Sequence, residues 1–199
     1  TNAPSFTVSW YATDDPDGIA NYDIQYQING GAWTDLLIQT TQTSYQFTNA
    51  QNGLTYGFRG RARDNLGNVG SYPAAAQVQT TVQLLPSASI TPFNPNIINS
   101  TSPVTTSFQV AWNGSTPPGT VISQYQVYYQ VVNFAGQIVQ DWSLWQTVAG
   151  TVTSATFPVN FGNAIYNFQV VATNNYGPSP MTGTQASMIV DLGDTFHPV

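Results

Sequence analysis

The sequence contains no cysteine, no lysine and no glutamate, and it has a single histidine, His197, near its C-terminal end. Without cysteine there is no disulfide, no thiolate nucleophile and no cysteine-ligated zinc or iron–sulfur centre. Without lysine, Schiff-base catalysis and the Walker-type phosphate loop are excluded. One histidine leaves little for acid–base catalysis near neutral pH, so we expect a chain that is not an enzyme.

Charge is also scarce, because only 6% of the 199 residues are charged. Nine are acidic and three are basic, which gives a formal net charge of −6. Such a chain lacks the basic surface that nucleic acids attract, and no apolar run approaches the roughly 18 residues of a membrane span. We therefore expect no nucleic-acid partner and no membrane insertion. The neutral Thr-, Asn-, Gln- and Ser-rich polar set favours an extracellular or cell-surface location.

What the chain does contain is alternation of apolar and polar residues. Hydrophobic residues make up 41% of it, with 13 prolines and 16 glycines. Apolar residues recur at every second position in Phe6–Trp10, Tyr22–Ile28 and Tyr56–Ala62. This period predicts half-buried antiparallel strands, and Asn29-Gly30 between two of them predicts a tight hairpin turn.

The chain also repeats itself. Phe6, Val8 and Trp10 return as Phe108, Val110 and Trp112, and Tyr22-x-Ile24-x-Tyr26 returns as Tyr125-x-Val127-x-Tyr129. Tyr56-x-Phe58-x₃-Ala62-x₄-Gly67 returns as Tyr166-x-Phe168-x₃-Ala172-x₄-Gly177. The second copy has a longer middle loop, about 132–143. The repeat predicts two homologous domains, residues 1–85 and 86–192, followed by a C-terminal tail, 193–199.

These anchors resemble the fibronectin type III family, as found in bacterial secreted and cell-surface proteins: a Trp on the second strand, a Tyr on the third and a Tyr-x-Phe…Ala…Gly pattern on the sixth. The resemblance implies an all-β fold of two tandem seven-stranded immunoglobulin-like β-sandwiches. The first domain has only residues 1–5 before Phe6, so we expect it to lack most of its first strand. Either the chain was cut from a longer protein, or the open sheet edge is an assembly site.

Three aspartates, Asp14, Asp15 and Asp17, precede Gly18 in one loop. Carboxylates on a tight turn are what Ca²⁺ binds, so a weak calcium site is one interpretation, and no other cofactor is expected. The other is a plain turn whose Asp side chains bond the local backbone. The second domain has Ser115–Gly119 at this place, so a metal site would not be shared.

All three basic residues, Arg59, Arg61 and Arg63, fall on one strand with period two. They therefore share a face, with about 6.8 Å between neighbours. One interpretation is an anion-binding stripe. The favoured one is cross-strand pairing with carboxylates such as Asp23 on the neighbouring strand.

Other interaction candidates are aromatic or lie in sequons. Trp142 and Trp145 follow the third strand of the second domain and could stack on sugar rings or contact a protein, although burial at the sheet rim is equally compatible. Asn99 and Asn113 each begin an Asn-x-Ser/Thr sequon, which is an N-glycosylation site only in a source that glycosylates exported proteins.

The leading functional hypothesis is a non-catalytic extracellular structural or adhesive module of a cell-surface protein or assembly. Its partners would be neighbouring modules or identical subunits, and self-association through the open sheet edge is a specific form of this hypothesis. The alternative is a carbohydrate-binding or accessory module of a secreted polysaccharide-degrading enzyme, with a surface glycan as the partner.

Overall fold

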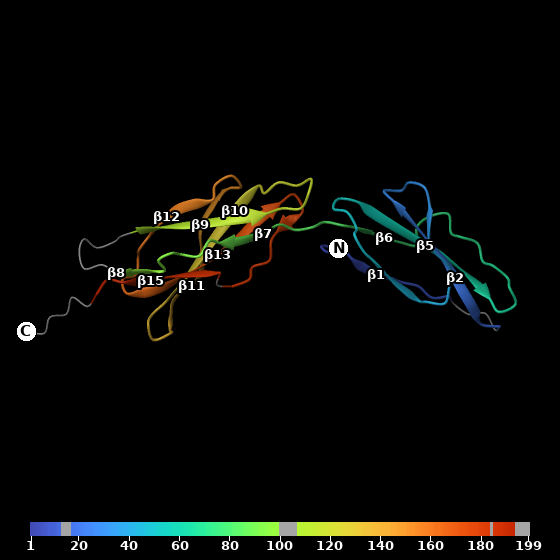
Figure 1. Cartoon of the computed structure of the whole chain (residues 1–199), viewed down its shortest axis with the longest axis horizontal. Helices are drawn as coiled ribbons and strands as arrows, with labels where there is room; N and C mark the ends of the chain where they lie inside the picture. Colours follow the sequence, from blue (N-terminus) through green and yellow to red (C-terminus); the bar gives the residue numbers. More distant parts are fainter. Residues whose placement is uncertain (13–16, 100–106, 184, 194–199) are drawn as a thin grey trace, which may run out of the picture. The chain divides into compact units, whose positions relative to one another are not determined.

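The computed structural model describes residues 1–12, 17–99, 107–183 and 185–193, and its regular secondary structure is β-strand throughout. The chain folds as two compact units, Thr1–Leu84 (unit 1) and Leu85–Val199 (unit 2) (Figure 1). Each unit consists of two sheets that enclose its own hydrophobic core. The predicted all-β fold is confirmed.

The described part of unit 1 contains six strands. They are β1 (Phe6–Ser9), β2 (Ile19–Ile28), β3 (Thr34–Thr40), β4 (Ser44–Phe47), β5 (Thr55–Asp64) and β6 (Val78–Thr81). One sheet pairs β1 with β4, and the other has the order β3-β2-β5-β6. Alternate side chains of these strands point inward, as the period-two pattern predicts. The buried core residues are Val8, Ala50, Tyr56, Phe58 and Val82.

Unit 2 repeats this plan with more strands. They are β7 (Ser87–Ile90), β8 (Ile97–Asn99), β9 (Ser107–Ser115), β10 (Gln124–Val132), β11 (Ile138–Ala149), β12 (Ser154–Pro158), β13 (Ala164–Asn174), β14 (Gly177–Pro178) and β15 (Ala186–Asp191). One sheet has the order β12-β9-β7, and the other has the order β11-β10-β13-β15-β8, with β14 paired to β13. The core is larger than in unit 1 and includes Trp112, which is 2% exposed.

The two units differ at their first strand. In unit 2, β7 pairs antiparallel with β9, and β8 then pairs parallel with β15, so that Ile98 lies opposite Val190. In unit 1, the Gln83 N–H donates to the Thr1 carbonyl at 2.8 Å, so Thr1 runs beside the end of β6 much as β8 runs beside β15. Nothing in the described part of unit 1 corresponds to β7. The expectation that the first domain lacks most of its first strand is confirmed.

Two local details connect sequence to fold. Asn29 and Gly30 both have positive φ, 52° and 73°, and the Gly31 N–H donates to the Ile28 carbonyl, as the predicted hairpin requires. Each unit also ties a core tyrosine to the backbone five residues upstream. The Tyr56 hydroxyl accepts from the Gln51 N–H at 2.8 Å, and the Tyr166 hydroxyl accepts from the Phe161 N–H at 2.9 Å. Such corners hold the crossing between the sheets.

The expected long loop at 132–143 is wrong. The structure extends β10 through Val132 and begins β11 at Ile138, so most of this segment is a hairpin. The side chain of Asn133 organises the short turn, because its Oδ1 accepts from the backbone N–H groups of Ala135 and Gln137. Trp142 therefore lies in a strand and not in a loop.

Candidate functional site

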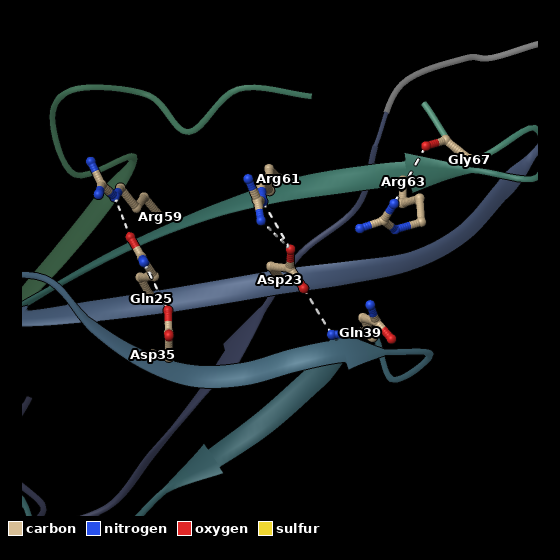
Figure 2. A network of polar contacts seen from close by, with 8 residues as sticks. All are labelled: Asp23, Gln25, Asp35, Gln39, Arg59, Arg61, Arg63 and Gly67. Atoms are coloured by element: carbon tan, nitrogen blue, oxygen red, sulfur yellow. Dashed lines mark hydrogen bonds and ion pairs between the residues drawn. The ribbon is translucent and has the colours of Figure 1, made fainter. Parts of the chain in front are cut away.

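The three arginines lie along β5, on the side of the β3-β2-β5-β6 sheet that faces away from the core (Figure 2). The strand register places Arg61 opposite Asp23 of β2. The Arg61 guanidinium forms an ion pair with Asp23 at 2.8 Å, and the second Asp23 oxygen accepts from the Gln39 N–H at 2.8 Å. The predicted cross-strand pairing is confirmed for Arg61.

Arg59 makes its contacts with neutral groups. Its Nε donates to Gln25 Oε1 at 2.9 Å, and its Nη1 donates to the Pro73 carbonyl at 2.8 Å. Gln25 in turn donates to Asp35 on β3 at 2.8 Å (Figure 2). This chain of contacts crosses three strands and fixes the plane of the Arg59 guanidinium.

Two aromatic rings complete this face. The Arg59 guanidinium lies 4.1 Å from the ring centre of Trp33 and 5.0 Å from that of Tyr72, and the Arg61 guanidinium lies 4.5 Å from Tyr72. We call these four residues the arginine–aromatic row. Planar cations between aromatic rings are held by cation–π attraction of about 0.5–2 kcal/mol each. The row is thus a flat, ordered surface.

Asp23, Arg61 and Tyr72 have shifted pKa values. Burial raises the pKa of Asp23, but the Gln39 N–H bond and the Arg61 guanidinium outweigh it, so the pKa ends below its usual 3.8. The hydrogen bond to Asp23 raises the pKa of Arg61. Burial, together with the nearby Asp23 charge, raises the pKa of the Tyr72 hydroxyl. These shifts stabilise fixed charges, and the anion-binding interpretation of the arginines stays a prediction.

Arg63, the third arginine, donates to the Gly67 carbonyl at 3.4 Å. The sequence alone did not reveal the role of Tyr72. It lies between β5 and β6, outside any periodic segment, and only the course of the chain brings it over the arginines. Trp33 stands beside the Asn29-Gly30 turn, which was the one available signal that it borders this sheet.

Unit 2 replaces the arginines. Its register pairs Tyr128 with Gln169 and Gln126 with Val171, at the places of Gln25–Arg59 and Asp23–Arg61. The arginine–aromatic row therefore belongs to unit 1 among the described residues.

The outer face of unit 2 carries instead a row of uncharged amide and hydroxyl side chains that ends at the Asp141 carboxylate. Gln130 donates to Asp141 at 3.2 Å, Asn167 donates to Gln130 at 3.2 Å, and Ser187 donates to Asn167 at 2.7 Å. These residues belong to β11, β10, β13 and β15, so the row, here called the amide row, crosses the whole antiparallel part of the sheet. Amide and hydroxyl groups in this arrangement present both donors and acceptors to a polar ligand.

The two candidate tryptophans of unit 2 lie in different environments. Trp145 is half-buried and packs edge-to-face on Phe157, with 4.9 Å between the ring centres, beside the core of unit 2. An interaction role for Trp145 stays a prediction. Trp142 is half-buried on the edge strand β11, beside a β-bulge and next to Asp141 of the amide row. Bulges re-aim side chains, and Trp142 stays the candidate for contact.

The remaining candidates stay predictions. Asp14 and Asp15 lie outside the described residues, and the exposed Asp17 accepts a bond from Asn65 through its main-chain carbonyl. Within the described residues, no three Asp, Glu, His or Cys side chains gather to hold a metal. The sequon residues Asn99 and Asn113 are both exposed.

Two further properties concern the chain as a whole. His197 lies outside the described residues. Across the described ranges, no helix has the length and apolar character needed to span a membrane.

Comparison with known proteins gives one sequence relative and several structures of similar fold. No protein-family model matches the chain. It is 28% identical over 197 residues to chitinase A1 of Niallia circulans, an alignment that covers 98% of this chain and 25% of that protein. The chain thus spans about a quarter of that relative's length.

Two of the similar structures contain fibronectin type III domains. A two-domain segment of chicken tenascin has a TM-score of 0.43 and 16% identity, over 89% of this chain and 88% of that one. The fibronectin(III)-like modules of Clostridium thermocellum CbhA have a TM-score of 0.36 and 14% identity, over 98% and 90%.

The strand order itself identifies the fold. The four-stranded order β3-β2-β5-β6 and the opposed β1–β4 pair in unit 1 recur in unit 2 as β11-β10-β13-β15 and β9–β12. Trp112 falls on β9 and the anchor tyrosines fall on β2, β5, β10 and β13, where the resemblance places them, while Trp10 directly follows β1. The chain is a tandem of two fibronectin type III-like β-sandwiches.

Proposed function

We propose that this chain is a non-catalytic accessory module of a secreted polysaccharide-degrading enzyme. The observation that carries the proposal is the alignment to chitinase A1, which runs through both units and covers 98% of the chain. An extracellular location follows from the same proposal and agrees with the nearly uncharged polar composition.

The polar chemistry of the described residues supports a binding or spacing role. Asp23 is committed to the Arg61 ion pair, and Asp35 and Asp141 accept hydrogen bonds from glutamine side chains. Glycoside hydrolysis requires two carboxyl groups that flank one bond, typically about 5–10 Å apart across an open site. Asp23, Asp35 and Asp141 each accept a hydrogen bond from a side chain on a neighbouring strand of their own sheet.

The surface that we assign to a glycan is the edge of unit 2 around Trp142. An aromatic ring offers an apolar face to a sugar ring, and Asp141, Gln130 and Asn167 of the amide row offer acceptors and donors beside it. Apart from the Asp141 carboxylate, the polar groups of this surface are uncharged, so its binding of a neutral polymer should depend little on salt.

A pull-down with insoluble polysaccharides tests the proposal. The 199-residue chain is incubated with chitin and with cellulose, alongside Trp142→Ala and a matched control, Ile38→Ala, which removes an exposed side chain from unit 1. Retention that Trp142→Ala abolishes and Ile38→Ala preserves supports the binding surface. Retention unaffected by Trp142→Ala rejects that surface, and release of soluble sugar by the chain rejects the non-catalytic assignment.

A structural or adhesive module at a cell surface is the second candidate function. The observation that favours it is the open edge of β1, which within the described ranges pairs only with β4. Unpaired strand edges are sites where another polypeptide adds a strand. Light scattering of the purified chain tests whether that polypeptide is an identical subunit.

A further inference from the structure

A groove of about 630 Å³ in unit 1 is lined by β1 and by Trp10–Ala12, the residues that follow β1, and among the described residues no strand pairs with Trp10–Ala12 on the groove side. One wall comes from β1 and the residues after it, including Val8 and Trp10, and the floor from the facing sheet, including Ile24, Phe58 and Ala62. Ile24 and Phe58 are 2% and 3% exposed, so the floor is the surface of the core itself. The groove therefore adjoins both an unpaired main-chain edge and apolar side chains.

Unit 2 shows what covers the corresponding surface there. Its β7 pairs with β9, so that Ile90 lies opposite Trp112, and Ile90 is 3% exposed. Trp112 and Trp10 occupy equivalent positions. The main-chain N–H of Trp112 donates to the Thr153 carbonyl at 2.8 Å, and that of Trp10 donates to the Thr43 carbonyl at 2.9 Å. Trp112 is buried under β7, whereas Trp10 is half-buried beside the groove.

One glutamine in each unit marks the position of this strand. The N–H groups of Gln185 and Gln77 donate to the carbonyls of Phe168 and Phe58, both at 2.8 Å, which makes the two glutamines equivalent. Gln185 Oε1 accepts from the Val170 N–H at 3.1 Å, and Gln77 Oε1 accepts from the Gly60 N–H at 2.7 Å.

In unit 2 the same side chain also holds β7. Gln185 Oε1 accepts from the Ile90 N–H at 2.9 Å, and its Nε2 donates to the Ala88 carbonyl at 3.2 Å. Gln77 is exposed and lines the groove, and among the described residues its Nε2 donates to no acceptor. The amide is thus oriented by Gly60 and has a donor left for a strand that enters the groove.

We propose that this groove binds an extended peptide strand from outside the 199 residues, running antiparallel to Trp10–Ala12 and carrying an aliphatic side chain at the place of Ile90. In unit 2, Ser89 pairs with Asn113 and Ala88 pairs with Gly114. When Trp112 is matched to Trp10, the peptide residue equivalent to Ser89 pairs with Tyr11, and a small residue equivalent to Ala88 lies opposite Ala12. A second copy of the chain is not the chosen donor, because β7 is already paired with β9 in its own unit.

The energetics suit peptide recognition by strand addition. The peptide main chain pairs with Trp10–Ala12 and with the side-chain amide of Gln77. Burial of one aliphatic side chain in the groove, beside the half-buried Trp10, adds a hydrophobic contribution. Main-chain pairing supplies affinity, and the pocket for the aliphatic side chain supplies specificity.

The test uses a synthetic ten-residue peptide with the sequence of residues 85–94, which contains β7, and the intact chain. Binding is followed by isothermal titration and by ¹⁵N-resolved NMR. We expect saturable one-to-one binding that shifts the Tyr11 amide and the Gln77 side-chain amide. Two control peptides carry Ile90→Asp or an N-methyl group on Ser89, and each should bind about tenfold more weakly or worse. Because these changes are in the peptide, they do not affect folding of the chain.

Other outcomes overturn the proposal. Absence of saturable binding at about 1 mM peptide, or equal binding of the control peptides, shows that the groove does not accept a strand. Dimerisation of the chain that the peptide reverses shows that the occupant is a second copy, which overturns the assigned source. The readout does not involve polysaccharide, so it is independent of the proposed function.

Discussion

Gln77 and Gln185 accept equivalent hydrogen bonds, Gln77 from the Gly60 N–H of β5 and Gln185 from the Val170 N–H of β13. The two glutamines differ in their further partners. Gln185 bridges β13 to β7, while Gln77 reaches only Gly60 among the described residues. The difference has a structural consequence. One repeat contains its first strand within the fold, and in the other no strand of the described residues occupies the groove beside Trp10–Ala12.

Replacing each glutamine by alanine should have unequal effects. Gln185→Ala removes the partners of the Ile90 N–H and the Ala88 carbonyl, so we expect the free energy of unfolding of unit 2 to fall by about 1–3 kcal/mol. Gln77→Ala removes one bond at an exposed position and should cost about 1 kcal/mol or less. Urea unfolding measures both, and hydrogen exchange should show faster exchange at the Ile90 amide in Gln185→Ala. Equal costs for the two variants would contradict the assigned bridge.

Asp23 should contribute more to stability than Asp35, although both accept hydrogen bonds on the same sheet. The side chain of Asp23 is 7% exposed and accepts hydrogen bonds from Arg61 and the Gln39 N–H. Asp35 is exposed, and its one hydrogen-bond donor among the described residues is Gln25. We expect Asp23→Asn to lower the free energy of unfolding by about 1–3 kcal/mol and Asp35→Asn by less than about 0.5 kcal/mol. Thermal unfolding followed by circular dichroism compares them, and similar melting temperatures for the two variants would refute the difference.

The sequence predicts the residues of the periodic strands but not the contacts made by the irregular segment between β5 and β6. Trp112 is buried on its expected strand, and Trp10 directly follows β1 and is half-buried. The pattern places both at or next to a strand because strand period and repeat are local properties. Tyr72 and Gln77 lie outside the regular strands, and their contacts with Arg59 and Gly60 depend on how the segment between β5 and β6 folds back over the sheet. That segment has no periodic pattern from which to infer its path.

Trp142 illustrates a second limit. We expect Trp142 in a loop from the sequence, because the aromatic anchor residues lie further apart in the second repeat than in the first, which indicates an inserted loop. The structure forms a β-hairpin there, and a bulge between Tyr129 and Val131 shifts the register of β11. A shift of one residue exchanges the two faces of a strand, so the sequence pattern could not assign a face to Trp142 or predict that Trp145 packs against the core of unit 2.

Stability should depend on pH through Asp23. Its pKa is lower in the folded chain than the 3.8 of a free carboxyl group, so the folded state favours the ionised form. The resulting stabilisation is fully present above about pH 5 and is lost as the pH falls through 3.8 toward the folded-state pKa. Urea unfolding between pH 7 and pH 2.5 should show a steeper loss for the native chain than for Asp23→Asn, which cannot ionise. Parallel curves would show that Asp23 is not responsible.

The two tryptophans of β11 should separate stability from binding. Trp145 contacts Phe157 at 4.9 Å and Phe168 at 6.4 Å, so Trp145→Ala leaves a cavity beside the core of unit 2 and should cost about 2 kcal/mol or more. Trp142 is absent from the described core cluster, and Trp142→Ala should cost less than about 1 kcal/mol. Urea unfolding gives the stabilities, and polysaccharide pull-down at a temperature where both variants are folded gives the binding. A large loss of stability in Trp142→Ala would place that ring in the core and remove it as a glycan contact.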